Sequence, residues 1–166
     1  MKLKNREVTL DRADLEILRA LQEDSRQTYT AIGKRLRISH STVYDRVKRM
    51  EEQKIIKGYT ALVDLEKAGV RNVLAVVTVY TDPKETEGVA EKLAKSCKVL
   101  EVYTSLSDEL VIMAKVWAGS QEELHEFIAS WVAPLQGVLR IRTSIITKKL
   151  KETYFSIENY SKRLHL

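Results

Sequence analysis

The chain has 166 residues, of which 44% are apolar and 31% are charged, and its formal net charge is +5. This composition is typical of a soluble globular protein of one or two domains. No apolar run approaches the roughly 20 residues of a membrane span, and the N-terminus lacks the apolar core of a secretory signal. The single cysteine excludes an internal disulfide, and no cysteine cluster indicates a zinc site, so a cytoplasmic protein is expected.

The charge is divided unevenly along the chain. Residues 1–60 carry a net charge of +5, residues 61–147 carry −3 and residues 148–166 carry +3. This distribution favours an N-terminal domain that faces DNA and a middle domain with another task. Charge alone leaves a solvated surface without a partner as an equally good interpretation.

The first helix is predicted to begin near Asp11, which can cap it. Leu10 precedes the cap and Leu15 lies in the first turn, at the two positions of a hydrophobic staple. Asp14 falls on the apolar face of this helix. An unpaired carboxylate on such a face is costly, so Asp14 needs a partner. Arg46, at the edge of the buried face of a later helix, is expected to be that partner instead of a DNA contact.

The next stretch has the outline of a helix-turn-helix. Residues 28–36 and 41–53 are predicted to form two helices joined by the turn Arg37-Ile38-Ser39, with Ser39 capping the second of them and Gly33 at a close helix crossing. The residues expected to face inward are Ala31, Ile32, Leu36, Val43, Val47 and Met50. Nine basic residues against three acidic ones over 26–57 indicate a reader of the DNA major groove. A plain three-helix bundle has the same apolar pattern and is the alternative.

The outer face of the last of these helices is short, polar and basic, as a groove-reading face should be. The residues expected to contact DNA from this helix are His40, Ser41, Thr42, Tyr44, Asp45, Lys48 and Arg49. Phosphate contacts are expected from Lys34, Arg37 and Lys57. Asp45 is unusual because it repels phosphate. It can accept a hydrogen bond from cytosine N4, or it can orient Arg49 one helical turn away.

Residues 55–64 alternate in polarity and are rich in β-branched side chains, which predicts a strand that leaves the reader domain. The strand is expected to serve as a wing and as the start of a connector. The sequence therefore predicts a DNA-binding domain over 1–55, a wing and connector over 56–72, a second domain over 73–148 and a basic tail over 149–166.

The second domain is predicted to run strand, helix, strand, strand, helix, strand. Asp82-Pro83 is expected to open its first helix, Ser120 and Glu123 to cap its second, and Cys97 to be a buried core thiol. The strands are predicted over 73–80, 99–104, 110–117 and 138–147. This order indicates a ferredoxin-like βαββαβ sandwich with both helices on one face of an antiparallel sheet.

The first strand of this domain offers apolar residues to both faces of the sheet, although an antiparallel sheet with a solvated face should alternate more cleanly. The open face is therefore expected to be covered by a second copy of the domain. A two-fold dimer would pair two DNA readers on a pseudo-palindromic site.

Three motifs follow one another ahead of the βαββαβ domain: Leu10-Asp11-x-x-Asp14-x-x-Ile17-Leu18-x-x-Leu21-Gln22, Leu36-x-Ile38-Ser39-x-Ser41-Thr42-Val43-x-x-Arg46-Val47-x-x-Met50-Glu51 and Ile55-Ile56-Lys57-Gly58-Tyr59. On these motifs the chain resembles, over nearly all of residues 10–148, the Lrp/AsnC family of prokaryotic transcription regulators. The resemblance implies an α+β protein with a winged helix-turn-helix joined to an effector-sensing and oligomerising domain. It also implies dimers that assemble further, often to octamers, and amino acids as effectors.

The chain departs from the family pattern in places. Arg37 stands where the family commonly has Gly, and His40 where it often has Pro. The family's effector loop corresponds to Ser105, Leu106, Ser107 and Asp108, of which only Asp108 matches well. Asp108 can meet an α-amino group and the serines a carboxylate. An ordinary polar hairpin loop is the alternative interpretation.

The sequence thus predicts a sequence-specific DNA-binding transcription regulator without cofactor or metal. A weakly specific architectural DNA binder is the alternative, and it would use the same residues. The ratio of specific to non-specific affinity distinguishes it from a sequence-specific regulator. Some tetrapyrrole decarboxylases resemble this fold and use His or Arg in a pocket. Here the histidines are His40, His125 and His165, and no paired carboxylates or nucleophile–base arrangement stands out, so no catalysis is expected.

Overall fold

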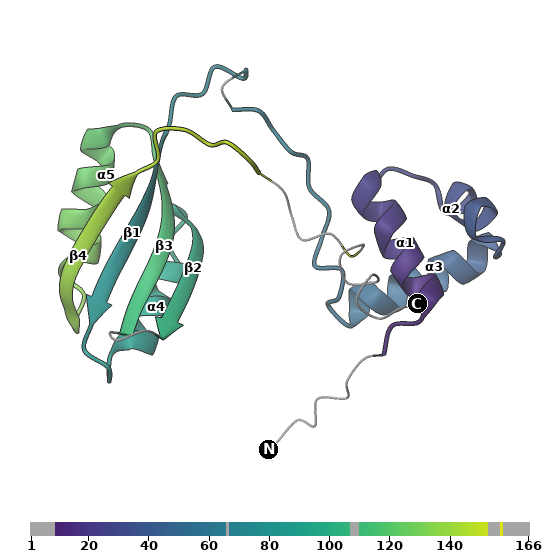
Figure 1. Ribbon diagram of the computed structural model, residues 1–166, viewed down its shortest axis with the longest axis horizontal. Helices are drawn as coiled ribbons and strands as arrows, with labels where there is room; N and C mark the ends of the chain where they lie inside the picture. Colours follow the sequence, from purple (N-terminus) through teal and green to yellow (C-terminus); the bar gives the residue numbers. More distant parts are fainter. Residues whose placement is uncertain (1–8, 66, 107–109, 153–156, 158–166) are drawn as a thin grey trace. The chain divides into compact units, whose positions relative to one another are not determined.

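The computed structural model describes residues 9–65, 67–106, 110–152 and 157 of the chain. The chain divides into two compact units (Figure 1). The described residues 9–62, 152 and 157 belong to the first unit, and those within 63–151 belong to the second. The described part of the first unit is built from helices, and the second is a sheet with two helices. Among the described residues, no helix is long and apolar enough to cross a membrane.

The first unit contains helices α1 (Arg12–Glu23), α2 (Tyr29–Leu36) and α3 (His40–Glu52). Helix α1 begins at the predicted place, and α2 and α3 lie within a residue or so of their predicted bounds. Asp11 caps α1, since its side chain accepts from the Asp14 amide at 2.8 Å and the Asp14 side chain accepts from the Asp11 amide at 3.1 Å. The core residues with 1% exposure or less are Ile17, Ala20, Ile32, Val43, Val47 and Met50. Ala31, predicted to face inward, is exposed, because it lies a quarter turn away from Ile32 on α2.

The turn between α2 and α3 is tightly built. Arg37 takes the left-handed conformation (φ 57°, ψ 40°), and Ser39 caps α3 by accepting from the Thr42 amide. A Cβ on Gly33 would lie 2.7 Å from the carbonyl oxygen of Ile38. Gly33 is therefore needed for the close approach of the turn to α2, where a helix crossing was predicted.

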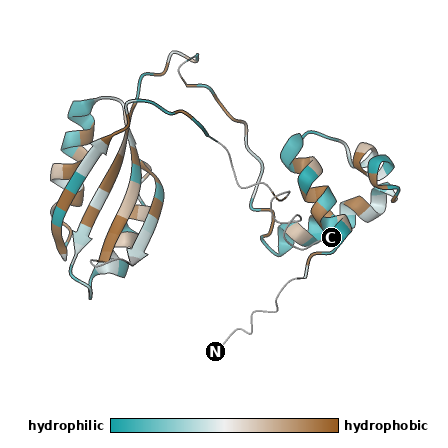
Figure 2. Cartoon of the chain, in the orientation of Figure 1, coloured by the Kyte–Doolittle hydropathy of each residue, from teal (hydrophilic) through white to brown (hydrophobic). Residues whose placement is uncertain are grey.

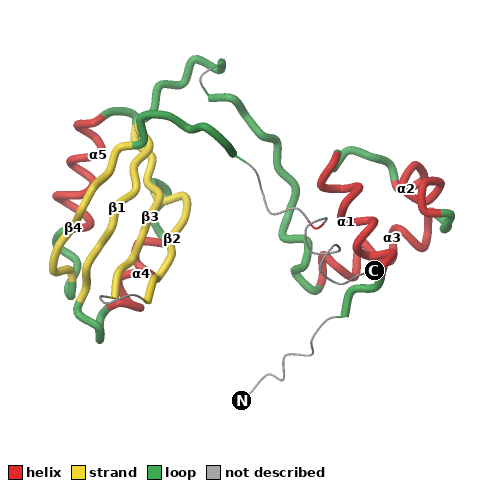
Figure 3. Tube along the Cα trace, in the orientation of Figure 1, coloured by secondary structure: helices red, strands yellow, loops and turns green. Residues whose placement is uncertain are grey.

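The strand predicted over 55–64 is not formed, and the described residues between α3 and β1 are loop (Figure 3). The amides of Ile55 and Ile56 both donate to the Met50 carbonyl, and their side chains pack against the helical core. These bonds continue the end of α3. No described segment pairs with residues 57–63, and a strand needs a ladder partner to satisfy its backbone groups. The expected wing is therefore wrong for the single chain.

The second unit contains β1 (Val73–Thr81), α4 (Thr86–Ala94), β2 (Val99–Leu106), β3 (Leu110–Ala118), α5 (Gln121–Phe127) and β4 (Val138–Ile145). The sheet is antiparallel with the order β2-β3-β1-β4, as in a ferredoxin-like fold. A π-helical turn over Ile128–Val132 extends α5. Figure 1 shows α4 and α5 on the same face of the sheet. The βαββαβ prediction is therefore confirmed.

Two local predictions in this unit are wrong. Helix α4 begins at Thr86 and not at Pro83, because residues 82–85 form a turn in which the Asp82 side chain accepts from the Lys84 amide at 2.9 Å. Cys97 is exposed and not a core thiol. It is four residues beyond the buried Leu93, but α4 has already ended at Ala94.

Within the described parts of the chain, no helix of the second unit covers the second face of the sheet. In β1 every second residue, starting from Ala75, is buried under the helices, and Leu74, Val76, Thr78 and Tyr80 face the other way and are half-buried. On β3 the matching residues include Met113 and Trp117, which are 37% and 38% exposed. Figure 2 shows hydrophobic residues along β1, whereas β4 combines hydrophobic and hydrophilic ones. This surface, which we call the open face, mixes apolar and charged side chains.

Candidate nucleic-acid interface

Helix α3 has one buried side and one solvent side. Val43, Val47 and Met50 are buried in the helical core. The candidate residues on the remaining surface of the helix are His40, Ser41, Tyr44, Asp45, Lys48 and Arg49, which are exposed, and Thr42, which is half-buried. The helix thus presents a polar face long enough for a few base contacts in a major groove.

Four basic residues surround or lie on this face: Lys34 on α2, Arg37 in the turn, Lys48 on α3 and Lys57 beyond it. All four are exposed, and none forms an ion pair with a residue that the structure describes. Their charges are therefore available to phosphate groups. Arg35, the other basic residue of α2, is bound instead to Glu23 of α1 at 2.8 Å.

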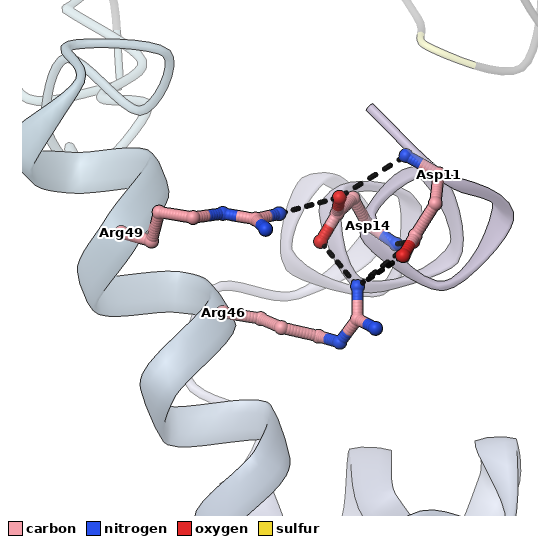
Figure 4. A network of polar contacts seen from close by, with 4 residues as sticks. All are labelled: Asp11, Asp14, Arg46 and Arg49. Atoms are coloured by element: carbon pink, nitrogen blue, oxygen red, sulfur yellow. Dashed lines mark hydrogen bonds and ion pairs between the residues drawn. The ribbon is translucent and has the colours of Figure 1, made fainter. Parts of the chain in front are cut away.

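Two arginines of α3 point toward the start of α1 (Figure 4). Arg46 Nη1 lies 2.8 Å from Asp14 Oδ1 and 2.7 Å from Asp11 Oδ2. Arg49 Nη2 lies 2.5 Å from Asp14 Oδ2. The ion pair predicted between Asp14 and Arg46 is present, and Asp14, whose side chain is 1% exposed, has both of its oxygens satisfied.

This network perturbs the acid–base behaviour of its outer members. The hydrogen bond from Arg46 holds the pKa of the Asp11 carboxyl below its usual value, and the bond with the Asp14 amide adds to the effect. The same contact with Asp11, followed by that with Asp14, raises the pKa of Arg46. Both groups are therefore charged at neutral pH, and the network ties α3 to the N-terminus of α1.

Arg49 was expected to contact DNA directly, and the structure places its guanidinium on Asp14. The side chain is still 44% exposed, so donors other than the one on Asp14 are open to solvent. The structure describes both Asp45 and Arg49 and shows no ion pair between them. The idea that Asp45 orients Arg49 is therefore wrong. A helical-wheel argument cannot find the Asp14 contact, because it does not show which way a long side chain bends.

The start of α3 is organised by hydroxyl groups. Ser39 Oγ lies 2.8 Å from Ser41 Oγ and 2.7 Å from Thr42 Oγ1, besides accepting from the Thr42 amide at 3.0 Å. Ser41 remains exposed, and Thr42 is held against the cap. Both hydroxyls contact Ser39, and Ser41 is the better-placed of the two for a contact outside the protein because it is exposed and Thr42 is half-buried.

An aromatic contact lies beside these hydroxyls. The ring of Tyr29, the first residue of α2, lies 6.1 Å from the ring of His40 and 6.2 Å from that of Tyr44, measured between centroids. Tyr29 is half-buried, and burial raises the pKa of its phenol. It supports two exposed rings of the candidate face. The apolar spacing in the sequence gave no signal for this role.

The predicted effector loop is only partly described. Ser105 is half-buried near the end of β2, opposite Val111, and Leu106 pairs with Leu110 across the hairpin. Ser107 and Asp108 lie outside the described residues. In the part of the chain that the structure describes, no group of three or more His, Cys, Asp or Glu residues is placed to hold a metal ion.

A three-helix unit whose third helix has an exposed polar side, joined to a ferredoxin-like domain, is the architecture of a DNA-binding protein of the helix-turn-helix class with a separate second domain. Residues 10–51 match the AsnC-type helix-turn-helix domain, and residues 74–154 match the Lrp/AsnC ligand binding domain. The chain belongs to the Lrp/AsnC family of transcription regulators.

Individual relatives agree with this assignment. The chain is 38% identical over 142 residues to the HTH-type transcriptional regulator LrpA of Pyrococcus horikoshii, a match that covers 86% of this chain and 99% of the relative. It is 31% identical over 143 residues to the HTH-type transcriptional regulator Ptr1 of Methanocaldococcus jannaschii, covering 86% and 95%. Both relatives are HTH-type transcriptional regulators.

Solved structures show the same fold. AsnC of E. coli superimposes with a TM-score of 0.78 at 21% identity, covering 90% of this chain and 99% of that one. The transcriptional regulator NMB0573 of Neisseria meningitidis, solved as a complex with L-Met, gives a TM-score of 0.74 at 26% identity, covering 87% and 94%. The α+β fold predicted from the family resemblance is confirmed.

Proposed function

We propose that this protein is a cytoplasmic, sequence-specific regulator that inserts α3 into the major groove and binds a pseudo-palindromic operator as a dimer or larger oligomer. The observation that carries the proposal is the solvent side of α3, where Ser41, Asp45 and Lys48 are exposed and polar. Lys34, Arg37 and Lys57 flank it as phosphate contacts, which set register and orientation on the duplex.

The charge balance of α3 favours base reading over non-specific binding. Arg46 and Arg49 are already paired with acidic residues of α1, and Asp45 adds a negative charge to the exposed face. An architectural protein gains its affinity mainly from unpaired basic side chains on phosphates. The face of α3 is poorly suited to that task, so we place the architectural role second.

The open face supports assembly of two copies. It combines half-buried apolar residues on β1 with Met113 and Trp117 on β3, and the guanidinium of Arg140 lies 3.8 Å from the ring centroid of Tyr80. A second sheet packed on this surface would bury these side chains and hold two readers together. Larger assemblies such as an octamer remain part of the same proposal.

Oligomerisation is tested by placing a charge on the open face. Met113→Asp should lower the molar mass seen by sedimentation to that of the single chain and weaken operator binding, while the circular dichroism stays unchanged. Ala129 is exposed in the helical turn that extends α5, on the opposite side of the sheet, so Ala129→Asp adds the same charge there and should keep the assembly. An unchanged mass for Met113→Asp refutes the open face as the interface.

The second unit is proposed to sense a small molecule. Its match to a ligand-binding domain and the L-Met complex of a structural neighbour support an amino acid as effector, held near Ser105, Leu106, Ser107 and Asp108. Thermal shifts measured with each of the common amino acids test this idea. A ligand that raises the melting temperature of the wild type but not of Asp108→Ala supports this site, and an equal shift in both places the ligand elsewhere.

The DNA-binding proposal is tested by fluorescence anisotropy at two salt concentrations, with the protein's own upstream region and a random duplex as probes. A preference of roughly a thousandfold or more for the upstream region supports a specific regulator. Similar, steeply salt-dependent binding to both supports the architectural role. Absence of binding to either duplex refutes a DNA-binding function.

A further inference from the structure

The contact between Arg49 and Asp14 removes Arg49 as a partner for Asp45. With Arg49 held by α1, Asp45 is an exposed carboxylate on the groove-reading face, and it forms no ion pair with any described residue. Lys48 lies three residues further along the helix and is likewise exposed and unpaired among the described residues. Residues at this spacing are neighbours on a helix surface, so two opposite charges stand side by side on this face.

We propose that Asp45 and Lys48 together read one C·G base pair in each half-site of the operator. Asp45 accepts a hydrogen bond from N4 of the cytosine, and Lys48 donates to O6 or N7 of the paired guanine. This inference rests on the proposed function, since it assigns the base specificity of the same helix.

The chemistry of the base edges selects cytosine for Asp45. A carboxylate that enters the groove gives up water and repels phosphate, so it needs a donor in return. Guanine shows only acceptors in the major groove, and thymine shows an acceptor and a methyl group. Adenine shows its N6 donor beside the N7 acceptor, which repels a carboxylate. Cytosine alone presents a donor without an acceptor on the same base.

The same edges select guanine for Lys48. An ammonium group carries donors only, and guanine offers two adjacent acceptors in O6 and N7. In a C·G pair the cytosine donor and the guanine O6 acceptor are next to each other in the groove. Two neighbouring side chains of opposite charge therefore match the two bases of one pair. Their net charge is zero, so together they neither attract nor repel the phosphates.

The first step of the test is selection from a random duplex pool with the wild type, Asp45→Ala and Lys48→Ala. The wild type should select a C·G pair at one position of each half-site. Asp45→Ala should select this pair more weakly, through Lys48 alone, while its preferences at the other positions are unchanged. An undiminished preference for the C·G pair in Asp45→Ala overturns the inference. A wild type that selects no sequence at all refutes the proposed function, and the inference with it.

The second step probes single atoms on the selected duplex. N4-methylcytosine blocks the groove-facing donor, and 7-deazaguanine removes the N7 acceptor, while pairing is kept in both. Each change should weaken wild-type binding by roughly tenfold, as base mismatches do. Asp45→Ala should be insensitive to N4-methylcytosine. Equal losses in wild type and variant would show that Asp45 does not contact this base.

Lys48 has its own discriminating readout. Lys48→Ala should weaken the preference for the C·G pair, which Asp45 alone then maintains, without a change in the slope of affinity against salt concentration. A salt slope lower by about one unit with base preference intact would make Lys48 a phosphate contact and overturn its role here.

Discussion

Arg49 Nη2 and Asp14 Oδ2 lie 2.5 Å apart, so a residue on α3, the helix proposed to face DNA, is bound to a carboxylate that is 1% exposed. Asp14 holds Arg46 with its other oxygen at 2.8 Å. One acidic residue of α1 thus fixes two side chains of α3 and, through them, the orientation of the helix that is proposed to read DNA. The stability of the three-helix unit and the orientation of α3 are therefore coupled at this point.

Asp14→Asn should lower the free energy of unfolding by about 2 kcal/mol. The change removes the charge that two guanidinium groups face, and hydrogen bonds to charged groups contribute about 1.5–3 kcal/mol each, reduced here because both arginines are partly exposed. Urea denaturation measures the difference. Asp45→Asn, an exposed aspartate without a described partner, is the matched control and should change stability by less than about 0.5 kcal/mol. Equal stability of the two variants would show that the network does not hold the helices.

The Asp11–Arg46 contact predicts a pH dependence of stability. The folded pKa of Asp11 is below its unfolded value of about 3.9, so its contribution is fully present above that value and is lost as the pH falls through the folded pKa. The free energy of unfolding should therefore fall in acid below about pH 4. Asp11→Asn should have a shallower acid slope, and 0.5 M salt should reduce the difference because the Asp11 side chain is 54% exposed. Parallel acid slopes for the two proteins contradict the prediction.

How well the sequence predicted this site depended on the kind of signal. The spacing of Val43, Val47 and Met50 fixed the buried side of α3, and the cost of an unpaired Asp14 predicted Arg46 as its partner. Both arguments use properties of the residues themselves. The partner of Arg49 followed from neither, because its wheel position is on the outside and only the structure shows the side chain returning to α1.

The wrong predictions in the fold have a common cause: they depend on contacts with other segments, which the local sequence pattern does not show. Residues 55–64 have a strand's alternation, but a strand also needs a neighbour, and the amides of Ile55 and Ile56 instead bond to Met50 at the end of α3. Cys97 fits the periodicity of α4 but lies beyond its last residue, Ala94. Periodicity predicts which face is apolar and does not predict where the element ends.

Gly33→Ala should destabilise the helix-turn-helix. Its Cβ would lie 2.7 Å from the Ile38 carbonyl oxygen, a backbone atom that moves only if the turn shifts. A cost of about 1–3 kcal/mol is expected for such overpacking, visible as a lower melting temperature. Gly88→Ala on α4 is the control, since nothing lies within 4 Å of a Cβ there, and it should stabilise by up to about 1 kcal/mol. A loss of stability in Gly88→Ala comparable to that in Gly33→Ala would contradict the steric argument.

Arg37→Gly should raise stability and weaken DNA binding at once. Arg37 has a φ of 57°, and relief of this left-handed conformation should add about 0.5–1 kcal/mol to the free energy of unfolding, since glycine adopts it without steric cost. The loss of a phosphate contact should lower the slope of binding against salt concentration by about one unit. Lys54→Gly is the matched control, because Lys54 has a φ of 58° and the same charge but lies past the end of α3 and outside the proposed contacts. It should gain the same stability and keep the salt slope. A smaller slope in both variants would mean that the effect comes from net charge and not from a contact at Arg37.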